Sequence, residues 1–303
     1  MSNKTIVNLI SPKLDRMIKV KYFLVDYYLS RGYFRYPKNS KKRFGEGGKR
    51  LSKKRKIKKP IFSIITVVLN NQKFLETTIK SVLNQSFKNY EYIIIDGGSN
   101  DRTMDIIKKY ENKIDYWVSE KDKGLYDAFN KGMMLASGEF IGIINSDDVY
   151  TKNSLKIISN YISKYKNIDF IFGSVKKHWG VLYGYRPEKI HYSWGFYSSH
   201  STGFFLKKSS AMKVGLYDIN YKYHADYDYF YRLIAQHKMR GIATKKNQIT
   251  GIFRRGGFSS TISYRKLFKE ELMIRWNNKQ NKLLILIIFI YKFFKHFRKI
   301  IKQ

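Results

Sequence analysis

From Pro60 onward, short apolar runs alternate with segments whose apolar residues recur at helical spacing. The first run, Ile61 to Leu69, is rich in β-branched residues, as expected for a strand that is covered on both faces. This alternation predicts an α/β fold with a mostly parallel sheet and helices on both of its faces. We expect strands at 61–69, 92–95, 114–118, 140–144 and 168–172, and helices at 74–83, 101–110, 125–136 and 154–165.

Three polar clusters follow strands of this expected sheet. They are Asn70-Asn71, the turn from Asp96 to Asp101, and Asn145-Ser146-Asp147-Asp148. Ligands of open α/β sheets bind beyond the carboxyl ends of the strands. The three clusters therefore predict one shared binding site at that edge.

The carboxylates of Asp147 and Asp148 come directly after an apolar run, where burying both would cost free energy. One interpretation is an exposed turn in which an aspartate caps the next helix. The other is a site for Mg²⁺ or Mn²⁺, which take one or two carboxylates and complete their shell with substrate phosphates. The pair alone does not decide between the two.

The turn Asp96-Gly97-Gly98-Ser99-Asn100-Asp101 joins a carboxylate at a strand end to two glycines. Its structural interpretation is a tight turn with a helix cap from Ser99 or Asp101. Its functional interpretation is a nucleoside site, in which Asp96 accepts hydrogen bonds and the glycines admit the ligand close to the backbone. The turn is neither a Walker A loop nor a G-x-G-x-x-G fingerprint, so ATP hydrolysis and dinucleotide binding are poorly supported.

Five motifs occur in order along the chain: Thr66 with Asn70, the Asp96-to-Asp101 turn, Glu120 to Gly132 (EKDKGLYDAFNKG), Ala136-Ser-Gly-Glu139, and Asn145-Ser-Asp-Asp148. Together they resemble the family 2 glycosyltransferases, in the branch that assembles bacterial polysaccharide and lipopolysaccharide. The resemblance covers residues 61–260. It implies the GT-A fold, with a Rossmann-like, mostly parallel sheet between helices, here flanked by basic extensions at both ends.

Three segments of the second half extend this resemblance: His200 to Lys208, Ala225-Asp-Tyr-Asp228, and Phe253-Arg-Arg-Gly-Gly-Phe-Ser259. It implies an inverting enzyme in which Asp226 accepts the proton of the acceptor hydroxyl, because a sugar hydroxyl is a poor nucleophile. His200 and Asp228 are implied to lie on the acceptor side. Asp228 is the rival base, and it would face elsewhere if the segment is helical.

The resemblance also implies a donor site for a UDP-, dTDP- or GDP-linked sugar. A divalent cation, Mg²⁺ or Mn²⁺, would be held by Asp147 and Asp148 and would stabilise the leaving diphosphate. Asn145 replaces an aspartate that many relatives have, so a degenerate fold that only binds sugar stays open as an alternative. The residues implied to bind the donor are Thr66, Asn70, Asp96, Gly97, Asp122, Asn130, Asp147, Gly256 and Gly257.

The formal net charge of +36 is concentrated at the two ends of the chain. We expect a basic extension and flexible linker at residues 1–59, with a short helix within 5–30, and a catalytic domain at 60–262. Charge alone also permits nucleic-acid binding, but no helix-turn-helix, zinc or RRM signature accompanies it. We therefore expect no nucleic-acid partner.

The remaining segment, 263–303, is expected to be a helical tail that is both basic and apolar. Its run from Leu283 to Ile290 is flanked by lysines and is too short to span a bilayer. It either packs as a buried helix on the catalytic domain or binds anionic lipid at the membrane interface. We favour the second alternative. Because the chain also lacks cysteine and a secretory signal at residues 1–30, we expect a cytoplasmic protein that is peripheral on the inner face of the cell membrane.

Overall fold

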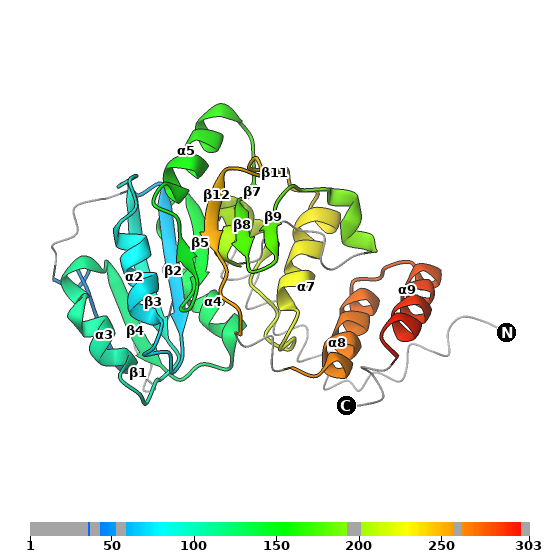
Figure 1. The fold of residues 1–303 in the computed structure, drawn as a ribbon, viewed down its shortest axis with the longest axis horizontal. Helices are drawn as coiled ribbons and strands as arrows, with labels where there is room; N and C mark the ends of the chain where they lie inside the picture. The colour runs from blue at the N-terminus through cyan, green and yellow to red at the C-terminus, as the bar shows by residue number, and fades with distance from the viewer. Residues whose placement is uncertain (1–35, 37–42, 53–58, 193–200, 257–261, 298–303) are drawn as a thin grey trace.

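The computed structural model describes residues 36, 43–52, 59–192, 201–256 and 262–297. Within them, the main sheet has eight strands in the order β1-β4-β3-β2-β5-β10-β7-β11 (Figure 1). A smaller sheet of four strands has the order β6-β12-β8-β9. The predicted α/β class with a mostly parallel sheet is confirmed.

Four parallel strands form the centre of the main sheet: β2 (Phe62–Val68), β3 (Tyr90–Asp96), β4 (Tyr116–Glu120) and β5 (Phe140–Asn145). Every residue of β2 is buried, including Ser63 and Thr66, as its richness in β-branched residues predicts. In the register, Val68 lies opposite Asp96 and Val67 opposite Asn145. The polar clusters that follow β2, β3 and β5 therefore emerge at one edge of the sheet.

The other strands extend the two sheets. β10 runs antiparallel between β5 and β7, and β11 pairs with β7 in parallel. In the small sheet, β12 joins β8 in parallel and β6 antiparallel, while β8 and β9 pair antiparallel. Their bounds are β6 Val149–Tyr150, β7 Phe170–Phe172, β8 Ser174–Lys177, β9 Gly180–Leu182, β10 Phe204–Lys207, β11 Gly241–Ala243 and β12 Ile249–Ile252.

Helices cover both faces of the main sheet, as predicted. Alternate strand residues such as Ile64 and Ile65 belong to different core clusters, because successive side chains of a strand point to opposite faces. Helices α2, α3 and α5 pack on the face of Ile64, and α4, α6 and α7 on the face of Ile65. Their bounds are α2 Leu75–Leu83, α3 Thr103–Lys109, α4 Leu125–Leu135, α5 Ser154–Lys164, α6 Lys208–Val214 and α7 Ala225–Tyr231.

Strand β1 (Arg43–Gly47) pairs antiparallel with β4 at the edge of the main sheet. The prediction of a flexible linker is therefore wrong for this part of the segment 1–59. A partly buried ion pair just after the strand anchors this segment: Arg50 Nη2 donates to Glu91 Oε2 at 2.7 Å, and Arg50 Nη1 donates to the Leu135 carbonyl at 2.9 Å. The helix expected within residues 5–30 lies outside the described residues.

We expect Glu91→Gln to lower the free energy of unfolding at pH 7 by about 3 kcal/mol, because it leaves the Arg50 charge without its partner. Burial alone would raise the pKa of Glu91, but the Arg50 charge and hydrogen bonds from Ser63 and Ser137 outweigh it, and the pKa lies below its usual value. This stabilisation is present above the unfolded pKa of about 4.3 and is lost as the pH falls through the lower folded pKa.

Urea unfolding of the wild type and of Glu91→Gln from pH 7 to pH 3 checks this expectation. The difference in free energy of unfolding between the two proteins should stay constant near neutral pH and become smaller below about pH 4. A difference that does not change over this range would contradict the assigned charge state of Glu91.

The C-terminal segment forms two helices, α8 (Tyr264–Asn277) and α9 (Lys282–Lys295). In Figure 1, α8 lies beside α7 and α9 lies beside α8, both far from β1. A buried cluster joins the two helices: Glu271 accepts from Arg275 Nη2 at 2.8 Å and from Lys292 Nζ at 2.6 Å. Within the described ranges, no helix has the length and apolar character needed to cross a membrane.

Candidate active site

The carboxylate of Asp96, the last residue of β3, organises the turn that follows it. Asp96 is fully buried. Its Oδ1 accepts from the Ser99 hydroxyl at 2.5 Å, and its Oδ2 accepts from the Ser119 hydroxyl at 2.6 Å and from the amides of Gly98 and Ser99 at 3.1 Å. These four hydrogen bonds all come from nearby residues and make Asp96 an anchor of the turn. The turn itself lies at the carboxyl end of β3.

Gly97 lies directly against Asp122, which confirms that two distant motifs meet at this edge. A Cβ atom on Gly97 would fall 2.3 Å from Asp122 Oδ2, so a side chain at this position requires the carboxylate to move. Burial raises the pKa of Asp122, and the charges of Asp127 and Asp96 raise it further, while the Gly124 amide and Lys131 oppose the shift. Acidic side chains are therefore concentrated around Gly97 and Asp122. Such a cluster is typical of functional sites, and it favours hydrogen-bond donors and cations as ligands.

Asn70 and Asn71 connect the end of β2 to its neighbours on both sides. Asn70 has a positive φ of 49° and its side chain accepts from the Asn100 amide at 2.8 Å. The Asn71 side chain donates to the Ser146 hydroxyl at 2.8 Å. The polar clusters after β2, β3 and β5 are therefore physically joined, as the sequence predicts.

Asp147 and Asp148 differ sharply in exposure. Asp148 is fully buried, and its two carboxylate oxygens accept from the Thr202 hydroxyl and from the Arg254 amide, the latter at 3.0 Å. Burial raises the pKa of Asp148 to about 7, and the neighbouring Asp147 charge adds to the rise. Asp147 is only partly buried; burial raises its pKa, and Arg254 counteracts this. Asp147 is thus the member of the pair that remains open to a ligand.

A divalent cation fits the partly exposed Asp147 better than Asp148, which is fully buried with a hydrogen bond to each carboxylate oxygen. The described residues contain no group of three or more His, Cys, Asp or Glu arranged to hold a metal ion. The buried Oδ1 of Asn145 has no hydrogen-bond partner in the described part of the chain. One carboxylate, that of Asp147, is enough for Mg²⁺ or Mn²⁺ when substrate phosphates and water supply the other ligands. The predicted metal role of Asp148 is therefore not supported.

Asp226 lies in the first turn of α7 and is tied to the donor side through α4. Its Oδ1 accepts from the Tyr227 amide at 2.9 Å and lies 3.3 Å from the hydroxyl of Tyr126. That hydroxyl also donates to the Tyr223 carbonyl at 3.0 Å. Tyr126 stands four positions after Asp122. One short stretch of chain therefore contacts both the Gly97 turn, through Asp122, and the candidate base Asp226, through Tyr126.

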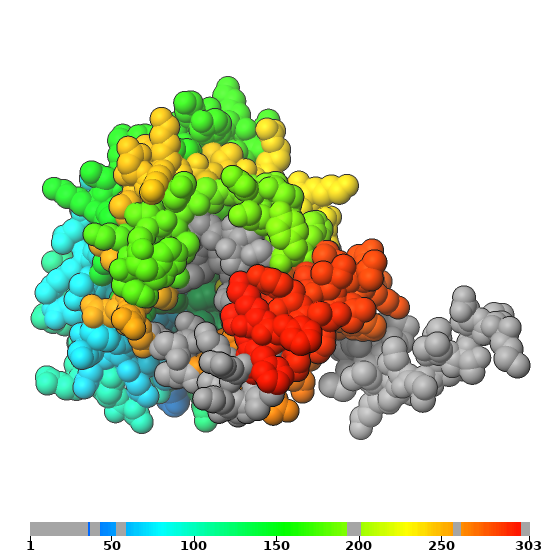
Figure 2. Space-filling view, turned by 45° about the vertical axis from the view of Figure 1, so that its right-hand side comes forward, coloured from blue at the N-terminus to red at the C-terminus, as the bar shows by residue number. Residues whose placement is uncertain are grey.

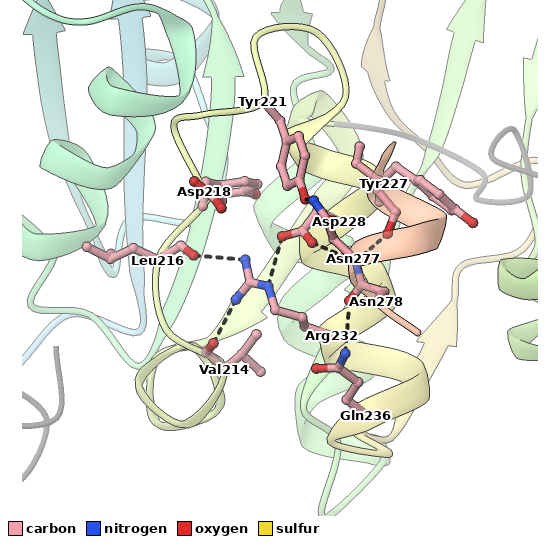
Figure 3. Close-up of polar contacts among 12 residues, drawn as sticks. Val214, Leu216, Asp218, Tyr221, Tyr227, Asp228, Arg232, Gln236, Asn277 and Asn278 are labelled. Carbon is pink, nitrogen blue, oxygen red and sulfur yellow. Dashed lines mark hydrogen bonds and ion pairs between the residues drawn. The ribbon is translucent and has the colours of Figure 1, made fainter. Parts of the chain in front are cut away.

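Asp228 makes a separate set of contacts (Figure 3). Its carboxylate is buried, accepts from Arg232 Nε at 2.9 Å and accepts from Asn278 Nδ2 at 2.8 Å. Arg232 in turn donates to the carbonyls of Val214 and Leu216. The predicted acceptor-side role of Asp228 is therefore replaced by a structural one, and the helical spacing that turns Asp228 away from Asp226 is as expected.

Two predicted donor-binding side chains are also structural. Thr66 is fully buried, with its hydroxyl 2.9 Å from that of Tyr92, because β2 presents this residue to the core. Asn130 is buried and pairs with the backbone of Tyr217, donating to its carbonyl at 2.9 Å and accepting from its amide at 2.8 Å. Gly256 is exposed with a φ of 93°. His200 and Gly257 lie outside the described residues.

Arg254 is a site residue that the sequence analysis did not single out. Its amide binds Asp148, its Nε donates to the Asp147 carbonyl at 3.2 Å, and its guanidinium lies 3.8 Å from the ring centroid of Phe74. A cation fixed beside Asp147 suits a diphosphate ligand. The available signal was its position two residues before Gly256, in the Phe253-to-Ser259 segment whose glycines are implied to bind the donor.

The sequence of this chain resembles those of known proteins. Residues 63–215, half of the chain, match the model of glycosyl transferase family 2. This chain belongs to glycosyl transferase family 2. The predicted family is confirmed, and the protein is a transferase.

Relatives of this transferase occur in archaea and bacteria. It is 28% identical over 237 residues to an uncharacterized glycosyltransferase of Methanocaldococcus jannaschii, covering 74% of this chain and 82% of that one. It is 25% identical over 229 residues to a PGL/p-HBAD biosynthesis glycosyltransferase of Mycobacterium bovis, covering 69% of this chain and 83% of that one.

Solved structures share the fold. Residues 1–349 of S. aureus TarS in complex with UDP-GlcNAc match with a TM-score of 0.56 at 18% identity, over 71% of the transferase and 65% of that chain. The longer TarS chain is covered over 39% of its length. A mannosyltransferase of Pyrobaculum calidifontis, in complex with GDP-Man and Mn²⁺, matches with a TM-score of 0.56 at 13% identity, over 88% of the transferase and 74% of that chain. The predicted GT-A fold is confirmed.

Proposed function

We propose that this transferase moves a sugar from a nucleoside-diphosphate donor to a hydroxyl of a lipid-linked or polysaccharide acceptor, with inversion at the anomeric carbon. The observation that carries the proposal is the meeting of the Asp96 turn, Asp122 and Asp147 at one edge of a family 2 sheet. Tyr126 links that edge to Asp226, the candidate base.

The proposed donor site is formed by the carboxylates of Asp122 and Asp147 and by the guanidinium of Arg254. Gly97 gives a ligand access to the backbone beside Asp122. The Arg254 guanidinium lies beside Asp147 and would contact a diphosphate directly, whereas the Asp147 carboxylate would contact it only through a bound cation. The solved relatives in complex with UDP-GlcNAc and with GDP-Man support a nucleotide sugar of this class. The donor proposed here is therefore a UDP-, dTDP- or GDP-sugar.

Asp147, the partly exposed member of the aspartate pair, would hold the divalent cation. When bound, the cation supplies charge that stabilises the departing nucleoside diphosphate. Arg254 adds a fixed positive charge at the same place, independently of the metal. The Mn²⁺ of the mannosyltransferase relative supports the use of such a cation.

Asp226 would accept the proton of the attacking hydroxyl. Its position in the first turn of α7 and the contacts from Tyr126 and the Tyr227 amide limit the orientations of the carboxylate. A carboxylate that is held in place removes the proton as the new bond forms, so the hydroxyl oxygen attacks without developing a full positive charge. One such displacement inverts the anomeric centre.

Incubation of the purified protein with a panel of UDP-, dTDP- and GDP-sugars, with Mn²⁺ or Mg²⁺, tests the proposal. We expect one donor class to raise the melting temperature and to be turned over, because only a bound ligand stabilises the fold. A protein that binds and turns over none of these donors would contradict it.

We also propose that the enzyme works at the inner face of the cell membrane in cell-surface glycan synthesis. The support is α9, where large apolar side chains are exposed, among them Leu286 at 52% and Phe294 at 72%. Figure 2 shows this helix, in red, on the outer surface of the molecule. Lys282 begins the helix and Lys295 ends it, a combination of apolar and basic groups that suits an anionic lipid surface.

We expect Leu286→Asp and Phe294→Asp each to weaken sedimentation with anionic vesicles at low salt by about tenfold or more, since each replaces apolar contact with a charge. Trp179→Asp, at an equally exposed aromatic residue between β8 and β9, is the matched control and should bind vesicles like the wild type. Wild-type protein that does not sediment with anionic vesicles would contradict the membrane proposal.

A further inference from the structure

A carboxylate from α8 contacts the segment that leads into the helix of the candidate base. Glu270 Oε2 accepts from the Lys222 amide at 2.9 Å, and Glu270 Oε1 accepts from the amides of Tyr223 and His224 at 2.7 Å each. These three residues immediately precede α7, in which Asp226 is the second residue. One side chain, 44 positions further along the chain than Asp226, therefore holds the entry to the candidate catalytic helix.

The helix α7 needs such support because of its length. It has seven residues and continues into a π-helical segment at Arg232–Gln236, and the side chain of His224 at its N-cap makes no capping hydrogen bond. Even with this continuation, a helix of this length is at best marginally stable by itself. Hydrogen bonds between backbone amides and an ionised carboxylate are stronger than neutral ones, and Glu270 makes three of them.

The held segment contacts the candidate base through Tyr126. The carbonyl of Tyr223 and the Oδ1 of Asp226 lie 3.0 and 3.3 Å from the same Tyr126 hydroxyl. A shift of residues 222–224 therefore moves both the carbonyl that Tyr126 binds and the start of the helix that presents Asp226. Glu270 acts on Asp226 through the backbone, without touching it.

The rest of the C-terminal hairpin holds α7 on the other side of Asp226. The Arg275 guanidinium lies 5.1 Å from the ring centroid of Tyr227, and Gln280 Nε2 donates to the Tyr227 hydroxyl at 3.1 Å. Asn278 binds Asp228 (Figure 3). The hairpin α8–α9 thus contacts the residues before and after Asp226.

We propose that Glu270 is a positioning residue of this transferase, which sets the orientation of Asp226 by holding residues 222–224. The inference rests on the proposed role of Asp226. This role of Glu270 makes the α8–α9 hairpin a required part of the acceptor side of the active site. The hairpin lies outside the family-matched segment 63–215. The hairpin that carries the proposed lipid-facing surface of α9 is then also the element that holds the candidate base.

Steady-state kinetics of Glu270→Ala, Glu270→Gln and Asn277→Ala test the proposal. Glu270→Ala should lower kcat about 10- to 100-fold, as misplacement of a catalytic group does, and leave the donor KM unchanged. Glu270→Gln keeps one acceptor oxygen for the amides of Tyr223 and His224, so it should recover most of the lost kcat. Asn277→Ala removes another contact between α8 and the same loop, to the Tyr221 hydroxyl at 2.8 Å, and is the matched control with nearly wild-type kcat.

Hydrogen–deuterium exchange on the same proteins gives a readout that does not need activity. Glu270→Ala should raise exchange of peptides spanning 221–231 and leave those spanning 90–100 and 140–150 unchanged. If the wild type turns over no donor, the proposed function fails, and exchange alone then decides whether Glu270 holds α7. A Glu270→Ala protein with wild-type kcat, or with unchanged exchange at 221–231, would overturn the proposal.

Discussion

Asp226→Asn is expected to lower kcat for sugar transfer by about 10³-fold, the loss typical of a missing general base. Asparagine has nearly the same shape and still accepts the Tyr227 amide, so the position of α7 should be kept. Because the proposed role of Asp226 is on the acceptor hydroxyl, affinity for the nucleoside diphosphate should not change. Initial rates with saturating donor, together with donor titration by thermal shift, measure the two quantities separately.

Asp228→Asn is the matched control, two positions away on the same helix. It breaks the contact with Arg232 and so should lower the melting temperature more than Asp226→Asn does, with a smaller loss of kcat. The account is contradicted if Asp228→Asn abolishes transfer while Asp226→Asn keeps it.

Asp147→Asn is expected to lower kcat/KM by about 10²- to 10³-fold, because the cation that stabilises the leaving diphosphate loses its carboxylate. The wild type should bind a nucleoside diphosphate more tightly when Mn²⁺ is present, and the variant should lose this increase. Binding measured by calorimetry with and without Mn²⁺, and again after EDTA, reports it directly.

Asp148→Asn separates metal binding from structural support. The Asp148 carboxylate is buried against Thr202 and the Arg254 amide, so its loss should lower the melting temperature and leave the Mn²⁺ effect on nucleotide binding in place. If Asp148→Asn removes the Mn²⁺ effect and Asp147→Asn keeps it, the assignment of the two aspartates is reversed.

The parts of the fold that could be predicted from the sequence are those in which burial sets the pattern. β2 and β3 are buried on both faces, so their residues are mostly apolar on both faces, and polar clusters follow where the strands end. β1 could not be found in this way. It is a charged edge strand containing glycine, fixed in place by Arg50 and Glu91, which are 41 positions apart.

For the candidate site, sequence spacing located the edge but not the exposure of each side chain. The meeting of Gly97 with Asp122 follows from parallel strands that end together. The burial of Asp148 depends on Thr202 and Arg254, which come from distant segments. Likewise, the contacts of Glu270 with residues 222–224 form only when α8 folds back on α7, and no local pattern announces them.

Our central proposal is that sugar transfer proceeds by a single displacement at the anomeric carbon, with Asp226 as the base and inversion of the anomeric configuration. Proton NMR of the first-formed product, recorded with the donor sugar that the panel identifies, tests it most directly. The account predicts an anomeric signal of configuration opposite to that of the donor, formed by the wild type and about 10³-fold more slowly by Asp226→Asn. A product that retains the donor configuration would contradict the account.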